Sequence, residues 1–382
     1  MQAVDILKKL VSVDTTNPPG NEAELAAWID ETLKPLGFLT EQPECGKNRK
    51  SIIARLPMGE GPKLVFNGHL DVVPAGKGWT TPPFEPVIRD GKLYGRGSAD
   101  MKGGVAAMME AGIRIARNTQ GLWGELCLNF VADEEIINLG TLSCKHGWED
   151  GDYVVIGEPT NLQIAVAHKG TARFEITVEG RSCHSGMPWN GVNAVGKALK
   201  AVRAIEDMDR ALETVSHPLL GRPSISVTMI NGGEKDNIIP GTCRIAVDYR
   251  MIPGDTGDLA EERIREYLEK IKSSDDQFEY SLRRYINLEP GEIAMDHPFV
   301  KTAKAVFEKT AGEKTRVRDF PATCEQVLFT REGIPAIVIG PGSIEQAHIV
   351  DEFVELRQVE QAAKYYEMLA RHVLRKDSGQ NG

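Results

Sequence analysis

Histidine and acidic residues stand directly after several short apolar segments of this chain. His69 follows the segment 63–68, and Asp71 comes two residues later. A carboxylate behind a metal-bound histidine fixes the tautomer of the imidazole and raises its basicity. A loop histidine beside a capping aspartate gives the same pattern, so the pair predicts a metal site only in company with other ligands.

The same arrangement recurs at other apolar segments. Asp133, Glu134 and Glu135 end one of them, Glu158 follows a second, and His348 comes shortly after a third. Adjacent acids repel one another unless a cation or a shared proton is present. In an α/β sheet, ligands bind at the carboxyl ends of the strands. Random loops would not repeatedly place only histidine, aspartate and glutamate there, so the pattern predicts a site at one edge of a sheet.

A glycine-rich turn supplies a further carboxylate. The turn runs from Gly95 to Gly104 and carries Asp100. It lacks the Gly-Lys-Ser/Thr ending of a phosphate-binding loop and the spacing of a dinucleotide fingerprint, which leaves phosphate or nucleotide binding as a weak alternative. Its glycines would let the backbone approach a metal site, with Asp100 as a bridging carboxylate.

Together these residues predict a centre with two zinc-class ions. The predicted ligands are His69, Asp100, Glu135, Glu158 and His348. Two imidazoles and three carboxylates contribute about −3 against about +4 from two divalent ions, and the residual positive charge favours a bound hydroxide. Glu134 stays unligated in this scheme and could take the proton from that water and deliver it to a leaving nitrogen.

The elements that must position these residues alternate between strands and helices. Such alternation is typical of an α/β sheet with covering helices. The predicted strands are 51–56, 63–68, 125–131, 153–157 and 335–340, and the predicted helices are 22–36, 101–117, 298–310 and 359–374.

The middle of the chain has a different pattern. Its predicted order is strand 172–179, helix 192–205, strands 224–230 and 244–250, helix 259–272 and strand 278–286. The order β-α-β-β-α-β predicts a ferredoxin-like α+β sandwich. Because the α/β pattern resumes afterwards, we expect a discontinuous catalytic domain, 1–171 with 288–382, that carries 172–287 as an inserted lid.

Composition excludes several other classes of protein. A chain of 382 residues exceeds what one core usually organises, which favours two domains. Its net charge is −10, and no cluster of Lys and Arg predicts nucleic-acid binding. No segment approaches the roughly 20 apolar residues of a membrane span, and the N-terminus lacks the apolar core of a signal peptide. Six scattered cysteines predict neither disulfides nor a cysteine zinc site, so we expect a cytoplasmic protein.

In this order, the motifs resemble those of the zinc aminoacylase and exopeptidase family (peptidase family M20), which contains acetylornithine deacetylase, succinyl-diaminopimelate desuccinylase and the bacterial glutamate carboxypeptidases. The resemblance spans nearly the whole chain. It is carried by Gly68-His-Leu-Asp71, the turn 95–103, Asp133-Glu-Glu135, Gly157-Glu-Pro159 and Ala347-His348.

The resemblance implies a mixed-sheet catalytic domain and a role for each residue. One zinc would bind His69 and Glu158, the other would bind Glu135 and His348, and Asp100 would bridge them. Cobalt is a possible substitute for zinc. Asp71 would orient His69, and Glu134 would be the general base.

The resemblance also implies that the inserted domain forms a homodimer. His184 could then reach the neighbouring subunit's site and donate a hydrogen bond to the oxyanion. The alternative is a histidine in a hydroxyl-rich turn with no catalytic role. Asn237 and Arg250 resemble positions that hold the substrate's amide and carboxylate, to which a bidentate guanidinium is suited. Capping or pairing on the domain surface is the ordinary alternative for both.

Within the family, segment 339–353 looks closer to acetylornithine deacetylase than to the desuccinylase, whereas Thr323-Cys324-Glu325 departs from the usual Gly-Thr-Asp or Gly-Thr-Glu. We therefore expect hydrolysis of a small N-acyl amino acid, as in arginine biosynthesis. The alternatives are the desuccinylase of lysine biosynthesis, a related dipeptidase or exopeptidase, and a non-catalytic metal- or ligand-binding homologue.

Overall fold

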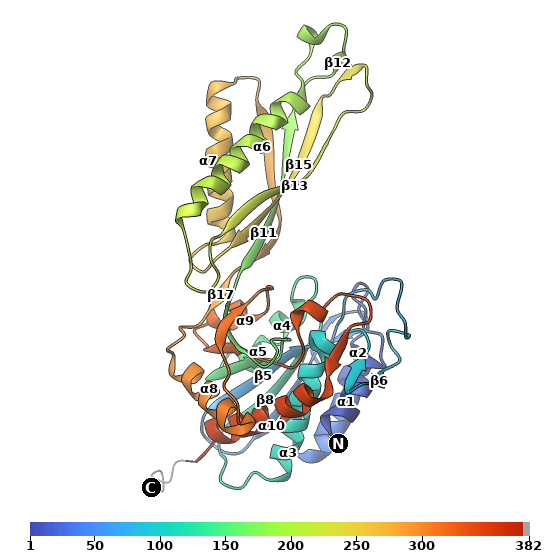
Figure 1. Ribbon diagram of the computed structural model, residues 1–382, viewed down its shortest axis with the longest axis vertical. Coiled ribbons are helices and arrows are strands. Elements are labelled where there is room, and N and C mark those ends of the chain that lie inside the picture. Colours follow the sequence, from blue (N-terminus) through green and yellow to red (C-terminus); the bar gives the residue numbers. More distant parts are fainter. Residues whose placement is uncertain (377–382) are drawn as a thin grey trace. The chain divides into compact units, whose positions relative to one another are not determined.

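The computed structural model describes residues 1–376 and divides into two compact units (Figure 1). The first unit comprises Met1–Val166 together with the chain from Glu292 onward, and the second is Ala167–Gly291. The segment 172–287, predicted to be an insertion, lies inside the second unit.

A nine-stranded sheet forms the centre of the first unit. Its order is β1 (Leu39–Glu41), β4 (Ile52–Pro57), β8 (Glu125–Val131), β5 (Lys63–His69), β9 (Tyr153–Ile156), β19 (Ala336–Val338), β10 (Ile164–His168) and β17 (Gly291–Glu292), and β18 (Val317–Phe320) pairs with β10. The strands β8, β5, β9 and β19 run parallel, and β4 and β10 pair antiparallel at either side of them. This mixed sheet confirms the predicted α/β class.

Helices cover both faces of the sheet. They are α1 (Ala3–Val11), α2 (Ala23–Leu33), α3 (Gly103–Arg117), α4 (Leu139–Ser143), α5 (Lys145–Trp148), α8 (Pro298–Ala311), α9 (Gln326–Thr330) and α10 (Leu356–Val373). The central strand β5 is covered on both faces. The ring centroid of Phe66 lies 5.3 Å from that of Tyr366 of α10. The preceding residue on the strand, Val65, packs in a core cluster with Trp148 of α5 and Phe329 of α9. Successive side chains of a strand point to opposite faces, so both faces of β5 are buried.

Two small sheets complete the first unit. One joins β20 (Phe353–Glu355), β7 (Lys92–Tyr94) and β6 (Val87–Arg89), and the other pairs β2 (Glu44–Gly46) with β3 (Arg49–Lys50). The sequence patterns missed these strands, and they also missed β10, β17 and β18. Most of them span only two to four residues, too short for an alternating pattern to be recognised.

The second unit has the predicted ferredoxin-like order. Its elements are β11 (Gly170–Glu179), α6 (Ala194–Ala211), β13 (Ser224–Gly232), β15 (Thr242–Met251), α7 (Gly257–Ser274) and β16 (Glu279–Leu288). The strands form an antiparallel sheet in the order β13-β15-β11-β16, and α6 and α7 pack side by side against it (Figure 1). On β11 the buried Phe174, Ile176 and Val178 alternate with more exposed residues, which gives this sheet one core face. A two-stranded sheet of β12 (Cys183–His184) and β14 (Ile238–Ile239) lies in the same unit.

The helices described over residues 1–376 include none that is long and apolar enough to cross a membrane.

Candidate metal centre

Three glycines bring the site's loops together. Gly157 follows β9, Gly340 follows β19, and Gly104 lies at the start of α3. A Cβ atom on either Gly104 or Gly340 would lie 2.1 Å from the carbonyl oxygen of Gly157, closer than real side chains approach. Only glycine permits this approach, which sets the turn of Asp100 against the loop of Glu158.

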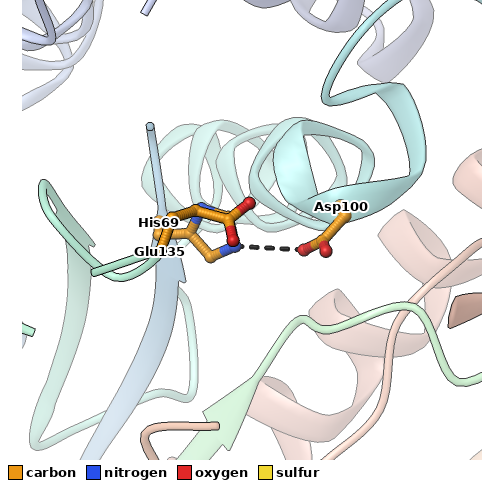
Figure 2. Close-up of side chains that lie close together, drawn as sticks. All are labelled: His69, Asp100 and Glu135. Atoms are coloured by element: carbon orange, nitrogen blue, oxygen red, sulfur yellow. Dashed lines mark hydrogen bonds and ion pairs between the residues drawn. The ribbon is translucent and has the colours of Figure 1, made fainter. Parts of the chain in front are cut away.

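One carboxylate lies between two imidazoles. Asp100 contacts His69 (Figure 2), with Oδ1 of Asp100 3.1 Å from Nε2 of His69. Oδ2 of Asp100 is 3.3 Å from Nε2 of His348. Two more carboxylates complete the arrangement: Oε1 of Glu158 lies 3.7 Å from Nε2 of His69, and Oε2 of Glu135 lies 3.1 Å from Nε2 of His348. The structure therefore gathers all five residues predicted to be ligands.

Glu134 lies in the same cluster. Two groups of residues could each hold a metal ion, because within each group the possible ligand atoms lie within 4.8 Å of one another. One group is His69 with Asp100 and Glu135, and the other is His69 with Glu134 and Glu158. By distance alone, Glu134 could be a metal ligand as readily as Glu158. The prediction instead left Glu134 without a metal, as the general base. The contacts of the two imidazoles instead divide the cluster around Asp100 into the two predicted sets: His69 lies beside Glu158, and His348 lies beside Glu135.

The electrostatics of the cluster suit a multivalent cation. Burial raises the pKa of Glu134 and Glu158 well above its usual range. Burial alone would lower the pKa of His69, but its contact with Asp100 and the charges of Glu158 and Glu134 raise it well above the usual value. Contacts with Asp100 and Glu135 raise the pKa of His348 to about 10. The cluster thus retains protons by itself, and a divalent ion can replace them.

A main-chain contact fixes the tautomer of His69. Its Nδ1 lies 2.9 Å from the carbonyl oxygen of Asp71, whereas the Asp71 carboxylate is 3.7 Å from Nδ1. Because a carbonyl only accepts hydrogen bonds, Nδ1 carries the proton, and the Nε2 lone pair that faces the cluster is free to bind a metal. Asp71 therefore orients His69, as predicted, but through its main-chain carbonyl oxygen and not through its carboxylate.

The carboxylate of Asp71 holds the loop of the two glutamates. The main-chain N–H groups of Glu134 and Glu135 donate to it at 3.1 and 3.2 Å, and Nδ2 of Asn17 donates at 2.8 Å. Asp71 is fully buried, so these bonds compensate the loss of water. The sequence patterns did not single out Asn17.

Asp133 fixes the start of the same loop. It adopts a left-handed backbone conformation with φ 66°, and its carboxylate accepts from Nη1 of Arg49 at 2.7 Å and from Asn17 at 3.1 Å. Arg49 also donates to Glu22 at 2.7 Å. This buried ion-pair network, which the sequence patterns did not predict, aims the following glutamates into the cluster.

Glu352 plays the corresponding part for the turn of Asp100. Its fully buried carboxylate accepts from the N–H groups of Gly97, Ala99 and Asp100 at 3.0, 2.8 and 3.1 Å. Nη1 of Arg96 donates to the same carboxylate at 2.5 Å. The partners lie more than 250 residues apart, and no local pattern links them.

Glu325, the residue that ends the atypical motif, is buried near His69. Its carboxylate accepts from Nδ2 of Asn67 at 2.6 Å and from the hydroxyl of Thr141. Burial raises its pKa, and the pKa of the neighbouring Cys324 thiol is raised well above its usual value by burial. Cys324 is therefore a neutral core residue.

The predicted oxyanion donor, His184, and the predicted substrate-binding residues, Asn237 and Arg250, lie in the second unit. His184 and Asn237 are exposed and adjacent, because Ser185 N–H donates to the carbonyl of Asn237 at 3.0 Å. Arg250 on β15 donates to Asp248 at 2.7 Å and to Thr171 at 2.8 Å. The structure places these three residues within their own unit.

Comparisons with known proteins agree with this fold. The model of "Peptidase family M20/M25/M40" matches residues 65–372. The acetylornithine deacetylase of Proteus mirabilis is 34% identical over 358 residues, covering 91% of this chain and 89% of the relative. That of Vibrio campbellii is 32% identical over 359 residues, covering 90% of each.

Solved structures share the architecture at lower identity. Aminopeptidase PepT from Bacillus cereus has a TM-score of 0.80 at 20% identity, covering 97% of this chain and 98% of that one. A dinuclear metal-binding peptidase of family M20 from Bacillus subtilis has a TM-score of 0.75 at 16% identity, covering 97% of both chains. These likenesses describe the fold.

Proposed function

Because the chain belongs to peptidase family M20/M25/M40, and so is a metal-dependent hydrolase of amide bonds, we propose that it removes the acyl group from an N-acyl amino acid, as an acetylornithine deacetylase does. The observation that carries the proposal is the Asp100 carboxylate, which has one imidazole at each oxygen. Eight acetylornithine deacetylases that are 31–34% identical to this chain support the deacetylase over a peptidase.

The donor set fits two divalent ions, which we propose to be zinc, with cobalt as a substitute. His69 and Glu158 would hold one ion, Glu135 and His348 the other, and Asp100 both. Imidazole and carboxylate are ligands that zinc accepts. When bound, the ions supply a Lewis acid for the acyl carbonyl and acidify a water molecule.

Glu134 would move the proton. The Asp71 carboxylate anchors its main chain, and its side chain reaches the cluster beside His69. In the proposed reaction the oxygen of water bonds to the acyl carbon, the carbon–nitrogen bond breaks, and Glu134 passes the water's proton to the departing amine. The raised pKa of Glu134, caused by burial, suits a group that must hold this proton in transit.

The second unit would act as a lid and a dimerisation domain. Its edge strand β13 exposes Met229 and Ile230, with 60% and 47% of their surfaces accessible, and unpaired edges of this kind readily take a partner strand. In the proposed dimer, His184 would donate to the oxyanion in the neighbouring subunit. Asn237 would hold the substrate amide, and Arg250 would use its remaining donors for the carboxylate.

The experiment is amine release from a substrate panel by protein loaded with zinc or cobalt. The panel contains Nα-acetyl-L-ornithine, N-succinyl-diaminopimelate and a set of dipeptides. We expect turnover of acetylornithine above the others. Preferred turnover of dipeptides would make the chain a dipeptidase, and absence of turnover across the panel would favour a binding protein.

The six free cysteines support a reducing cytoplasm as the compartment of this reaction.

A further inference from the structure

A buried carboxylate that is not a proposed ligand lies near the metal centre. Glu325 is fully buried at the start of α9, and the residues on either side of it are anchored in the core. Cys324 packs in the core cluster that contains Val65 of β5, and Nε2 of Gln326 donates to the carbonyl oxygen of Ala336 on β19 at 2.7 Å. The last residue of the atypical motif is therefore held in one place, although the proposed reaction gives it no role.

The two donors to Glu325 come from segments that carry the metal centre. Nδ2 of Asn67 donates to one carboxylate oxygen at 2.6 Å, and the hydroxyl of Thr141 donates to the other. Asn67 stands two residues before His69 on β5, and side chains two positions apart on a strand point to the same face. Thr141 lies on α4, the helix that follows the loop of the two glutamates. One carboxylate therefore ties the strand of His69 to that loop.

Glu325 lacks the cationic partner that other buried glutamates have. Glu352 pairs with Arg96, and Glu110 pairs with Arg114. Among residues 1–376, no lysine, arginine or histidine forms an ion pair with Glu325, whose side-chain hydrogen bonds come from one amide and one hydroxyl. Burying a carboxylate without a paired charge is costly. A positive charge beyond hydrogen-bond distance must therefore offset it.

The charge of Glu325 reaches the part of the cluster that contains His69. Burial raises the pKa of Glu134 and of Glu158, and the charge of Glu325 raises both further. Burial also raises the pKa of Glu325 itself, whereas the hydrogen bond from Thr141 and the charge of His69 lower it. A bound divalent cation is often the largest local charge in a site. An ion held by His69 and Glu158 would therefore supply the positive charge that Glu325 lacks.

We propose that Glu325 is a positioning residue whose ionised carboxylate, without contacting the metals, holds the strand of His69 in place and strengthens binding of the ion beside it. The inference rests on the proposed function, because it assumes the two-metal centre, and it adds a residue to that centre. Groups behind a ligand orient it and tune the metal. The atypical motif thus keeps, in Glu325, the acid with which the usual Gly-Thr-Asp and Gly-Thr-Glu forms end.

The test is Glu325→Gln, which removes the charge and can keep both hydrogen bonds, because the Thr141 hydroxyl can accept as well as donate. Without metal, the variant should unfold at or above the urea concentration that unfolds the wild type, since an unpaired buried charge has been removed. Competition with a chromophoric chelator measures zinc affinity. One of the two zinc ions should bind about 10- to 100-fold more weakly to the variant.

The matched control is Glu110→Gln, which neutralises a buried carboxylate on α3 that belongs to no part of the cluster. This carboxylate pairs with Arg114 and accepts from the N–H of Ala3 at 2.8 Å. Its loss should lower the urea midpoint of the metal-free protein and leave both zinc affinities unchanged. Glu325→Asp, which keeps the charge on a shorter side chain, should bind zinc more tightly than Glu325→Gln.

Weaker zinc binding by Glu325→Gln, with unreduced stability of the metal-free variant, supports the assigned role. Wild-type zinc affinity in Glu325→Gln would overturn it, because a neutral side chain would then suffice. A loss of metal-free stability as large as that of Glu110→Gln would also overturn it, since Glu325 would then be an ordinary structural residue. A wild type that binds two zinc ions and hydrolyses no N-acyl amino acid would overturn only the proposed reaction.

Discussion

Nε2 of His348 lies 3.3 Å from Oδ2 of Asp100, whose other oxygen is 3.1 Å from His69. His69 ends the strand β5, whereas His348 comes from a loop 279 residues later, so a single carboxylate joins two distant parts of the chain. A carboxylate placed in this way can bind two ions at once. The predictions below follow from this arrangement and from the groups that support it.

Asp100→Ala should remove the shared ligand and with it both ions. We expect bound metal to fall from two equivalents to below one, and kcat/KM to fall at least about 10³-fold, because metal catalysis supplies several kcal/mol. Elemental analysis of dialysed protein measures the loss. Two retained equivalents in the variant would contradict a bridging role, and Glu60→Gln, an exposed site, is the control.

Glu134→Gln should spare the metal and stop the chemistry. Proton transfer by a positioned side chain contributes about 10²- to 10⁴-fold, so kcat should fall within that range while metal content stays at the wild-type value. The same experiment resolves the position of Glu134 among the possible ligand atoms. If metal is lost together with activity, Glu134 is a ligand and another group moves the proton.

Glu352→Gln should destabilise the protein by about 3–5 kcal/mol, the usual cost of removing one partner of a buried ion pair, because the guanidinium of Arg96 would remain buried without its counter-ion. Urea unfolding of the metal-free protein measures this without interference from the ions. The matched control is Glu332→Gln, which breaks the exposed pair with Lys145. The control should cost about 1 kcal/mol or less, and equal losses in the two variants would contradict the assigned role of Glu352.

His168 should make stability depend on pH. Burial lowers its pKa from 6.5 to about 4, and its Nδ1–H donates to the carbonyl of Lys169 at 2.9 Å. A base whose folded pKa is depressed stays neutral in the fold but is protonated on unfolding, so its contribution is complete above pH 6.5 and is lost as pH falls toward 4.

Urea midpoints of wild type and His168→Gln, measured between these limits, test that prediction. The difference between the two proteins should change in favour of the variant as the pH falls. A difference that is constant with pH would mean that the histidine has no depressed pKa.

The sequence alone predicted the clustered histidines and carboxylates better than the residues that support them. His69, Glu135 and Glu158 could be found because each follows an apolar strand, and strand ends meet at one edge of an α/β sheet. Glu352 and Asn17 could not, because their role depends on hydrogen bonds to residues far along the chain, which leave no periodic pattern.

The strand β10 was missed for a different reason. Ile164–His168 begins with four apolar residues, and only Lys169 separates it from the strand β11. Short apolar runs are also ambiguous between helix and strand. The paired strand β19 shows the segment to be part of the catalytic sheet.

The most direct test of the central claim is a zinc titration of metal-free protein, followed by amine release from Nα-acetyl-L-ornithine. The account predicts that activity rises with added zinc and reaches its plateau at two equivalents per chain. A protein that binds two equivalents and releases no amine would contradict the proposed deacylase, and a plateau of binding at one equivalent would contradict the shared Asp100 site.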